Sequence, residues 1–152
     1  MNAIIFGANG QDGFYLSGLL EQKGIKVIGV SRSGNFLKTN IADFAEVAEL
    51  IKSSAPDFVF HLAANSTTRH DAIFENHETI STGTFNILEA VRLHSPTTKV
   101  FISGSGLQFE NKNLPIKESD PFEARDAYSV SRIQSVHAAR YFRRLEIGRA
   151  HV

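Results

Sequence analysis

Three glycines at intervals of three, placed directly after a short apolar run, constrain the fold of this chain more than any other feature. The run is Ala-Ile-Ile-Phe at 3–6, and Gly7, Gly10 and Gly13 follow it before a helical pattern begins. A continuous apolar run of this length is typical of a strand buried on both faces of a parallel sheet. The first glycine allows a tight turn, the second lets backbone amides approach a diphosphate, and the third lets a helix pack closely on the sheet. The stretch predicts a dinucleotide-binding turn, with an ordinary tight turn between strand and helix as the alternative.

The rest of the chain alternates apolar runs with amphipathic helical patterns. Further strands are expected at 26–30, 58–62 and 99–102. Helices are expected around 15–20, closed by Gly24, at 44–51 after Asp43, at 79–93 with an interruption near Asn76, and at 127–144 after the N-cap Asp126. This alternation predicts an α/β fold, a Rossmann-type parallel sheet with helices on both faces.

Composition narrows the class of protein. The chain has 152 residues, enough for one domain, and its 16 basic side chains balance its 16 acidic ones, so we expect no binding to nucleic acid or to an anionic membrane. No apolar run approaches the roughly 18 residues of a membrane span, and the chain starts in a strand pattern instead of a leader, so we expect a cytoplasmic protein. Cysteine is absent and the six histidines are scattered, which argues against a metal site.

The end of the second predicted strand bears on the choice of coenzyme. In dinucleotide folds, an acidic residue at this place binds the ribose 2′-hydroxyl of NAD. This chain has Ser31-Arg32-Ser33 instead. An arginine fork flanked by hydroxyls suits a 2′-phosphate, so the sequence favours NADP, with NAD as the second choice and a solvated loop arginine as the alternative.

Several motifs in order resemble one known family. Gly-Ala-Asn-Gly-Gln-Asp-Gly at 7–13, Leu62-Ala63-Ala64, Ser105, and Tyr-Ser-Val-Ser-Arg at 128–132 resemble the extended short-chain dehydrogenase/reductase family, which includes NAD-dependent epimerases and dehydratases. Within it, Gln-Asp-Gly at 11–13 and Ile-Gln-Ser at 133–135 are most similar to sugar-nucleotide enzymes of the GDP-mannose 4,6-dehydratase type.

The resemblance implies roles for individual residues. Tyr128 would be the catalytic acid/base on a sugar hydroxyl, Ser105 would hydrogen-bond that hydroxyl, and Arg132 would supply the cation that a phenol with an ordinary pKa of about 10 needs to act as a base near neutrality. The implied coenzyme-binding residues are Gly7, Asn9, Gly10, Gln11, Asp12, Gly13, Arg32, Ser33, Asn40, Ile41, Leu62, Ala63, Ala64, Ser66, Tyr128 and Arg132.

The chain departs from the family pattern at four positions. The family has a lysine where Arg132 stands, and arginine keeps the charge but does not relay a proton. The related dehydratases have a glutamate base at the position of Leu107, so its absence favours oxidation, reduction or epimerisation while the surrounding motifs favour dehydration. Asn40 replaces a frequent aspartate, and Ile80 a frequent polar residue. A non-catalytic NAD(P)-binding sensor or scaffold is the alternative function.

The resemblance also implies how the chain is divided. Residues 1–145 correspond to the N-terminal part of an NAD(P)-binding Rossmann domain, and the family's substrate domain is absent. The final Glu-Ile-Gly-Arg-Ala-His-Val at 146–152 resembles a translated sequencing adapter, so we expect an artefactual tail. The fourth strand should then be an unpaired edge, and the fragment should mainly bind the coenzyme. The implied partners are a nucleotide-sugar substrate and a second copy of the chain, docked through the helix that carries Tyr128.

Overall fold

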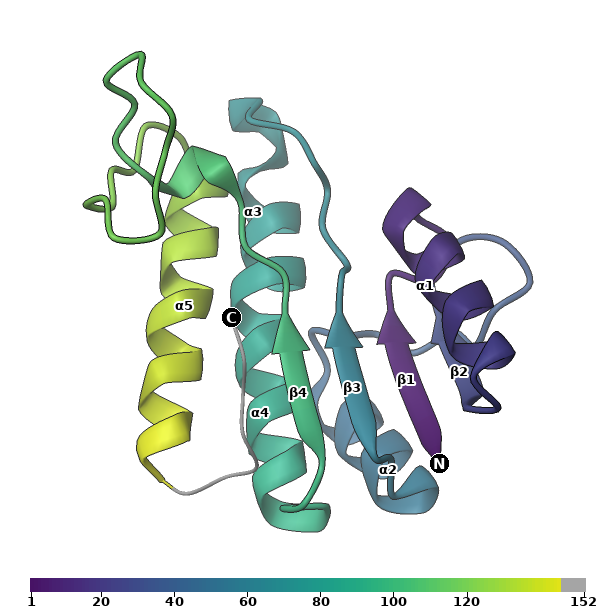
Figure 1. The fold of residues 1–152 in the computed structure, drawn as a ribbon. Helices are drawn as coiled ribbons and strands as arrows, with labels where there is room; N and C mark the ends of the chain where they lie inside the picture. The colour runs from purple at the N-terminus through teal and green to yellow at the C-terminus, as the bar shows by residue number, and fades with distance from the viewer. Residues whose placement is uncertain (146–152) are drawn as a thin grey trace.

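The fold is a four-stranded parallel sheet with helices on both faces, in a computed structural model that describes residues 1–145 (Figure 1). The strands are β1 (Asn2–Phe6), β2 (Lys26–Val30), β3 (Phe58–His61) and β4 (Lys99–Ile102). They lie in the order β2-β1-β3-β4, and every neighbouring pair is parallel. The Rossmann-type sheet predicted from the sequence is confirmed, although β3 ends one residue earlier than expected.

Within residues 1–145, five α-helices connect or follow the strands, and three of the helix ends match local sequence signals. They are α1 (Gln11–Gln22), α2 (Phe44–Ser54), α3 (Ile73–Asn76), α4 (Gly83–His94) and α5 (Ala127–Arg144). The side chain of Asp43 accepts hydrogen bonds from the first turn of α2, and that of Asp126 does the same for α5. Gly24 follows the last turn of α1 with a φ of +72°, as expected for a glycine that ends a helix.

The interruption expected near Asn76 is a change of helical pitch and not a break. A π-helical segment, η2 (His77–Thr82), joins α3 directly to α4. Its Ile80 carbonyl accepts hydrogen bonds from the hydroxyls of Thr84 (2.6 Å) and Ser135 of α5 (3.1 Å). The hydroxyl groups thus support the wider turn, and the sequence period alone does not reveal it.

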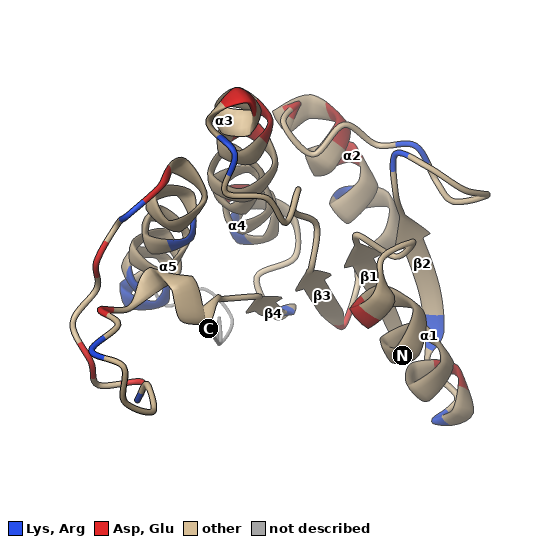
Figure 2. Ribbon diagram, turned by 90° about the horizontal axis from the view of Figure 1, so that it is seen from above, with Lys and Arg blue, Asp and Glu red and all other residues tan. Residues whose placement is uncertain are grey.

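Alternate residues of β1 enter two separate cores, which explains its continuous apolar run. Ile4 and Phe6 pack with α2, α4 and α5, whereas Ala3 and Ile5 pack with α1. Figure 2 shows α2, α4 and α5 along one face of the sheet and α1 on the other, beside β1 and β2.

On the α1 side, no helix among residues 1–145 covers β3 and β4 (Figure 2). The rings of Phe58, Phe60 and Phe101 form a row there, with centroids 6.4 Å and 6.2 Å apart. Phe101 is 40% exposed, and β4 pairs only with β3 within the described range, so the predicted edge strand is confirmed.

The turn between β1 and α1 has no room for side chains at two of its glycines. Gly7 has a φ of +91°, and a Cβ there would lie 2.7 Å from the backbone nitrogen of Ala63. A Cβ on Gly13 would lie 2.4 Å from the carbonyl oxygen of Gly7 and 2.7 Å from the Cα of Ala8. The start of α1 is therefore packed tightly against the ends of β1 and β3.

Adding a methyl group at Gly13 tests this packing. We expect Gly13→Ala to lower the free energy of unfolding by about 1–3 kcal/mol, because rigid backbone atoms occupy the space. Gly18, on the same helix, has no atom within 4 Å of a built Cβ, so Gly18→Ala should be neutral or stabilise by up to about 1 kcal/mol. Urea denaturation of both variants measures the difference, and equal effects would contradict the close approach.

Candidate functional site

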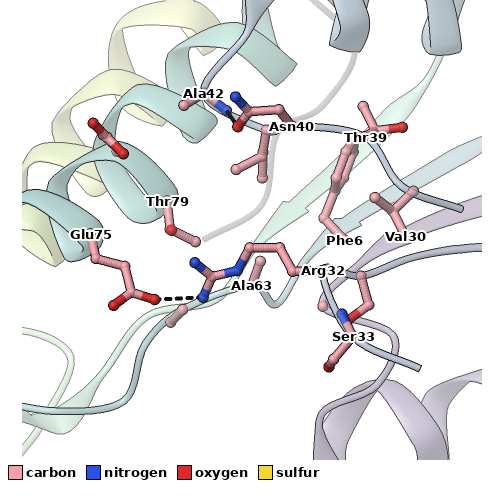
Figure 3. A pocket seen from close by; sticks show the side chains of 15 residues that line it. Phe6, Val30, Arg32, Ser33, Thr39, Asn40, Ala42, Ala63, Glu75 and Thr79 are labelled. Carbon is pink, nitrogen blue, oxygen red and sulfur yellow. Dashed lines mark hydrogen bonds and ion pairs between the residues drawn. The ribbon is translucent and has the colours of Figure 1, made fainter. Parts of the chain in front are cut away.

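A cavity opens at the carboxyl ends of β1, β2 and β3 (Figure 3). It lies between strands whose connections leave the sheet on opposite faces, the place where parallel α/β sheets bind ligands. Its lining consists of Phe6, Gly7, Val30, Ser31, Arg32, Ser33, Thr39, Asn40, Ile41, Ala42, Ala63, Ala64, Glu75, Glu78 and Thr79. The predicted coenzyme residues that the structure brings together here are Gly7, Arg32, Ser33, Asn40, Ile41, Ala63 and Ala64.

Other predicted coenzyme residues lie next to this cavity, at the opening of α1. Gly10 is the N-cap of α1, and Gln11 and Asp12 are exposed in its first turn. The amide of Asn9 donates to the Ser33 hydroxyl at 2.8 Å, which ties the glycine turn to the segment after β2. Amides at the start of a helix favour an anion, so this end suits a diphosphate.

Two further predicted residues, Leu62 and Ser66, lie neither in the cavity lining nor at the opening of α1. Leu62 packs with the core under α1, because it follows His61 and alternate residues of a strand face opposite sides of the sheet. Ser66 is exposed in the loop after β3.

The Arg32 side chain is 70% exposed but forms an ion pair, so it is not the purely solvated loop arginine that the sequence left as the alternative. Its Nη2 lies 2.6 Å from Oε1 of Glu75 on α3, and the Asn65 amide donates to Oε2 of Glu75 at 2.8 Å. The hydrogen bond from Arg32 is the main cause that lowers the pKa of the Glu75 carboxyl below its ordinary value. Sequence reasoning missed Glu75, because no local pattern links it to a residue 43 positions earlier.

Lys38 is a second cation that the sequence reasoning missed. Its Nζ donates to the carbonyl groups of Ser31 (3.1 Å) and Gly34 (2.7 Å), on the same turn as Arg32. The turn after β2 therefore carries two positive side chains.

Tyr128 and Arg132 form a buried pair on α5, as their four-residue spacing predicted. Arg132 Nε donates to the Tyr128 hydroxyl at 3.1 Å, and the two side chains are only 4% and 7% exposed, respectively. Arg132 Nη1 also donates to the carbonyl oxygen (2.6 Å) and the hydroxyl (3.0 Å) of Ser103, the residue after β4. Within residues 1–145, no carboxylate forms an ion pair with Arg132.

The structure brings Ser103 to this pair, and not Ser105. The Ser105 hydroxyl accepts a hydrogen bond from the Leu107 amide at 3.2 Å and caps the short 3-10 turn η3 (Gly106–Gln108). Ser105 also lines a separate cavity with Phe122 and Arg140. In the described part of the chain no hydrogen bond joins Ser105 to Tyr128. Both serines lie within three residues of the end of β4, and their spacing alone does not show which one reaches α5.

The other positions that depart from the family pattern have ordinary structural surroundings. Leu107 is 54% exposed and offers no group that could take a proton. Ile80 is completely buried. The Asn40 side chain accepts from the Ala42 amide at 3.1 Å, and its backbone N–H donates to Glu46 at 2.6 Å.

His61 is an uncharged polar group inside the core beside Arg132. It is completely buried, and neither ring nitrogen has a hydrogen-bond partner of ordinary geometry within the described residues. Burial, and after it the positive charge of Arg132, lower its pKa from 6.5 to about 4, while weaker contacts with the Ile80 and Thr79 backbone oppose the shift. The ring is therefore neutral at pH 7.

This shift predicts that acid weakens the fold through His61. Between about pH 6.5 and 4, the unfolded chain binds a proton at this ring that the folded chain does not, so the free energy of unfolding decreases as the pH falls. The loss approaches about 3 kcal/mol at pH 4, since one pKa unit corresponds to about 1.4 kcal/mol. His61→Phe should remove this slope from urea denaturation at several pH values, whereas His70→Gln, at an exposed histidine, should keep it. The same slope in His61→Phe and the parent chain would refute this assignment.

The opening of α1 and the turn after β2 offer hydrogen-bond donors and a positive charge at the crevice. The N-cap Gly10 has no side chain that could cap the first-turn amides of α1, and Arg32 and Ser33 line the cavity beside this helix end. No group of three or more His, Cys, Asp or Glu residues in the described range could hold a metal ion. Nor does that range contain a helix long and apolar enough to span a membrane.

Comparison with solved structures supports the fold. The Bordetella bronchiseptica enzyme WbmH in complex with NAD+ superposes with a TM-score of 0.78 and 25% identity, over 93% of this chain and 52% of that one. The UDP-glucose 4-epimerase of Brucella ovis in complex with NAD has a TM-score of 0.86 and 23% identity, over 98% of this chain and 50% of that one.

Comparison with sequences identifies the family. GDP-mannose 4,6 dehydratase 2 of Arabidopsis thaliana is 33% identical over 86% of this chain and 43% of its own length. The GDP-mannose 4,6-dehydratase of Yersinia enterocolitica is 29% identical over 86% of this chain and 42% of its own length. The chain thus spans less than half the length of these relatives. A model of the NAD dependent epimerase/dehydratase family matches residues 3–150, and the chain therefore belongs to that family.

Proposed function

We propose that this chain is the coenzyme-binding half of a nucleotide-sugar dehydratase or epimerase that uses NADP, with NAD as the second candidate. The observation that carries the proposal is that the crevice at Gly7 and the Tyr128–Arg132 pair occupy the same carboxyl edge of one sheet. Gly7 follows β1 and lines the crevice. Arg132 donates a hydrogen bond to Ser103, which follows β4. A coenzyme that begins at the opening of α1 can therefore extend along this edge toward the phenol.

The proposed chemistry assigns each polar group a separate task. The coenzyme, when bound, supplies hydride transfer to or from a sugar carbon. The Tyr128 hydroxyl exchanges the proton of the sugar hydroxyl. Arg132 donates to the phenolic oxygen at 3.1 Å and so positions it, and as a permanent cation it passes no proton onward.

The substrate is proposed to be a nucleotide sugar, following the names of the relatives. Dehydration needs a base that removes the proton beside the new keto group. Leu107 stands where the resemblance to the related dehydratases implies that base, and its side chain cannot take a proton, which favours oxidation, reduction or epimerisation. The similarity to GDP-mannose 4,6-dehydratases favours dehydration, so both reactions remain candidates. Ser105, Tyr128 and Arg132 remain the proposed catalytic residues.

A second copy of the chain is proposed to dock on α5. A groove between η2, α4 and α5 is lined by Phe85, Gln134, Ala138 and Tyr141, among others. Phe85 is 46% exposed and Tyr141 56%, so the groove presents apolar side chains to a partner.

Coenzyme titration is the first test of the function. We expect the chain to bind NADPH more tightly than NADH, because Arg32 and Lys38 stand at the turn after β2. Arg32→Ala should remove most of this difference and leave NADH affinity unchanged. Fluorescence titration measures the dissociation constants, and failure to bind either coenzyme would contradict the proposed function.

Tyr128→Phe separates an enzyme from a sensor or scaffold that only binds the coenzyme. In the full-length protein, we expect turnover of GDP-mannose or UDP-glucose to fall about 10²–10⁴-fold, because the acid/base group is lost. Coenzyme affinity should change less than about twofold. Tyr15→Phe, at a tyrosine that is 66% exposed on α1, is the control and should keep full turnover. Full activity in Tyr128→Phe would refute the catalytic role, and NADPH binding without turnover of any nucleotide sugar would favour the sensor.

A further inference from the structure

The ion pair between Arg32 and Glu75 spans the crevice from one wall to the other. Arg32 follows β2, whereas Glu75 lies on α3 and is held by Asn65 from the loop after β3. The sheet order places β1 between β2 and β3, so the pair passes over the end of β1, where the turn at Gly7 begins. Figure 3 shows the Arg32 side chain extending toward Glu75 among the residues that line the cavity.

Glu75 already occupies Arg32 as an anion, and it opposes the binding of a second anion there. Both carboxylate oxygens of Glu75 already accept hydrogen bonds, one from Arg32 and one from Asn65. A phosphate that binds Arg32 either displaces Glu75 or shares the guanidinium with it. Displacement breaks the ion pair, and sharing brings two anions to the same cation at short range. In both cases Glu75 weakens phosphate binding.

We infer that Glu75 is a specificity-determining residue that competes with the 2′-phosphate of the coenzyme for Arg32. This inference rests on the proposed coenzyme function and deepens it, because it explains how one site could accept both NADP and NAD. NAD has a hydroxyl in place of the phosphate and has no need of the guanidinium. Arg32 alone would bind NADP more tightly than NAD, and the ion pair with Glu75 reduces this difference in affinity.

Neutralising Glu75 tests the competition directly. We expect Glu75→Gln to tighten NADPH binding about two- to fivefold, the range of an exposed ion pair, and to leave the NADH dissociation constant unchanged. The gain should shrink as salt rises from 50 to 500 mM, because Arg32 and Glu75 are 70% and 40% exposed and salt screens such charges.

Two further variants separate competition from a general change of charge. Glu78 lines the same cavity but makes no ion pair within the described residues, so Glu78→Gln should give a smaller gain. In an Arg32→Ala background, Glu75→Gln should have no effect on NADPH, because the guanidinium for which the two anions compete is absent. Circular dichroism and urea denaturation of each variant confirm that it is folded.

The possible results distinguish the failure of this inference from that of the proposed function. Weaker NADPH binding in Glu75→Gln would show that Glu75 positions Arg32, and unchanged binding would show that the pair is irrelevant to specificity. An equal gain for NADH, or a gain that persists without Arg32, also overturns the inference. Each of these leaves coenzyme binding itself intact. If the parent chain binds neither NADPH nor NADH, both the inference and the proposed function are refuted.

Discussion

The geometry of the crevice depends on one backbone contact, where the turn after β1 meets the start of α1 and the loop after β3. The space that a Cβ of Gly7 would need is filled by the backbone of Ala63, and the space at Gly13 by Gly7 itself. Because backbone atoms cannot rotate aside as a long side chain can, α1 has little freedom to shift relative to the sheet. The amides of its first turn are thereby fixed at the carboxyl edge, next to the cavity.

At the other end of this edge, the buried guanidinium of Arg132 determines the charge around Tyr128 and His61. Arg132 is almost fully buried, and its hydrogen-bond acceptors are Ser103 and Tyr128, which lies one turn earlier on α5. Burying a guanidinium is costly unless it is well hydrogen-bonded, and these neutral acceptors leave its charge uncompensated. His61 responds by remaining neutral, with a pKa of about 4. The Tyr128 hydroxyl, which exchanges a proton in the proposed chemistry, is held by this cation.

Much of the fold could be predicted, because its signals are local. The glycine spacing, the apolar runs and the caps at Asp43 and Asp126 each depend on a few adjacent residues, and the structure agrees with all of them. The pairing of Tyr128 with Arg132 follows from the helical repeat in the same way. The π-helical segment η2 was not predicted, since it depends on a hydroxyl from Ser135, far along the chain.

The contacts that define the candidate site in detail are long-range, and the sequence could not show them. Glu75 meets Arg32 only because α3 returns over the sheet edge, and Ser103 reaches Arg132 only because α5 packs beside β4. Such contacts decide charge and hydrogen bonding at the site without leaving a periodic pattern.

A crystal structure of the chain with NADP bound would test the central claim most directly. The account predicts the diphosphate against the amides that open α1, the 2′-phosphate beside Arg32, and the nicotinamide ring on the side of the crevice that faces the Tyr128 hydroxyl. A coenzyme bound elsewhere, or a phenol turned away from the nicotinamide, would contradict it.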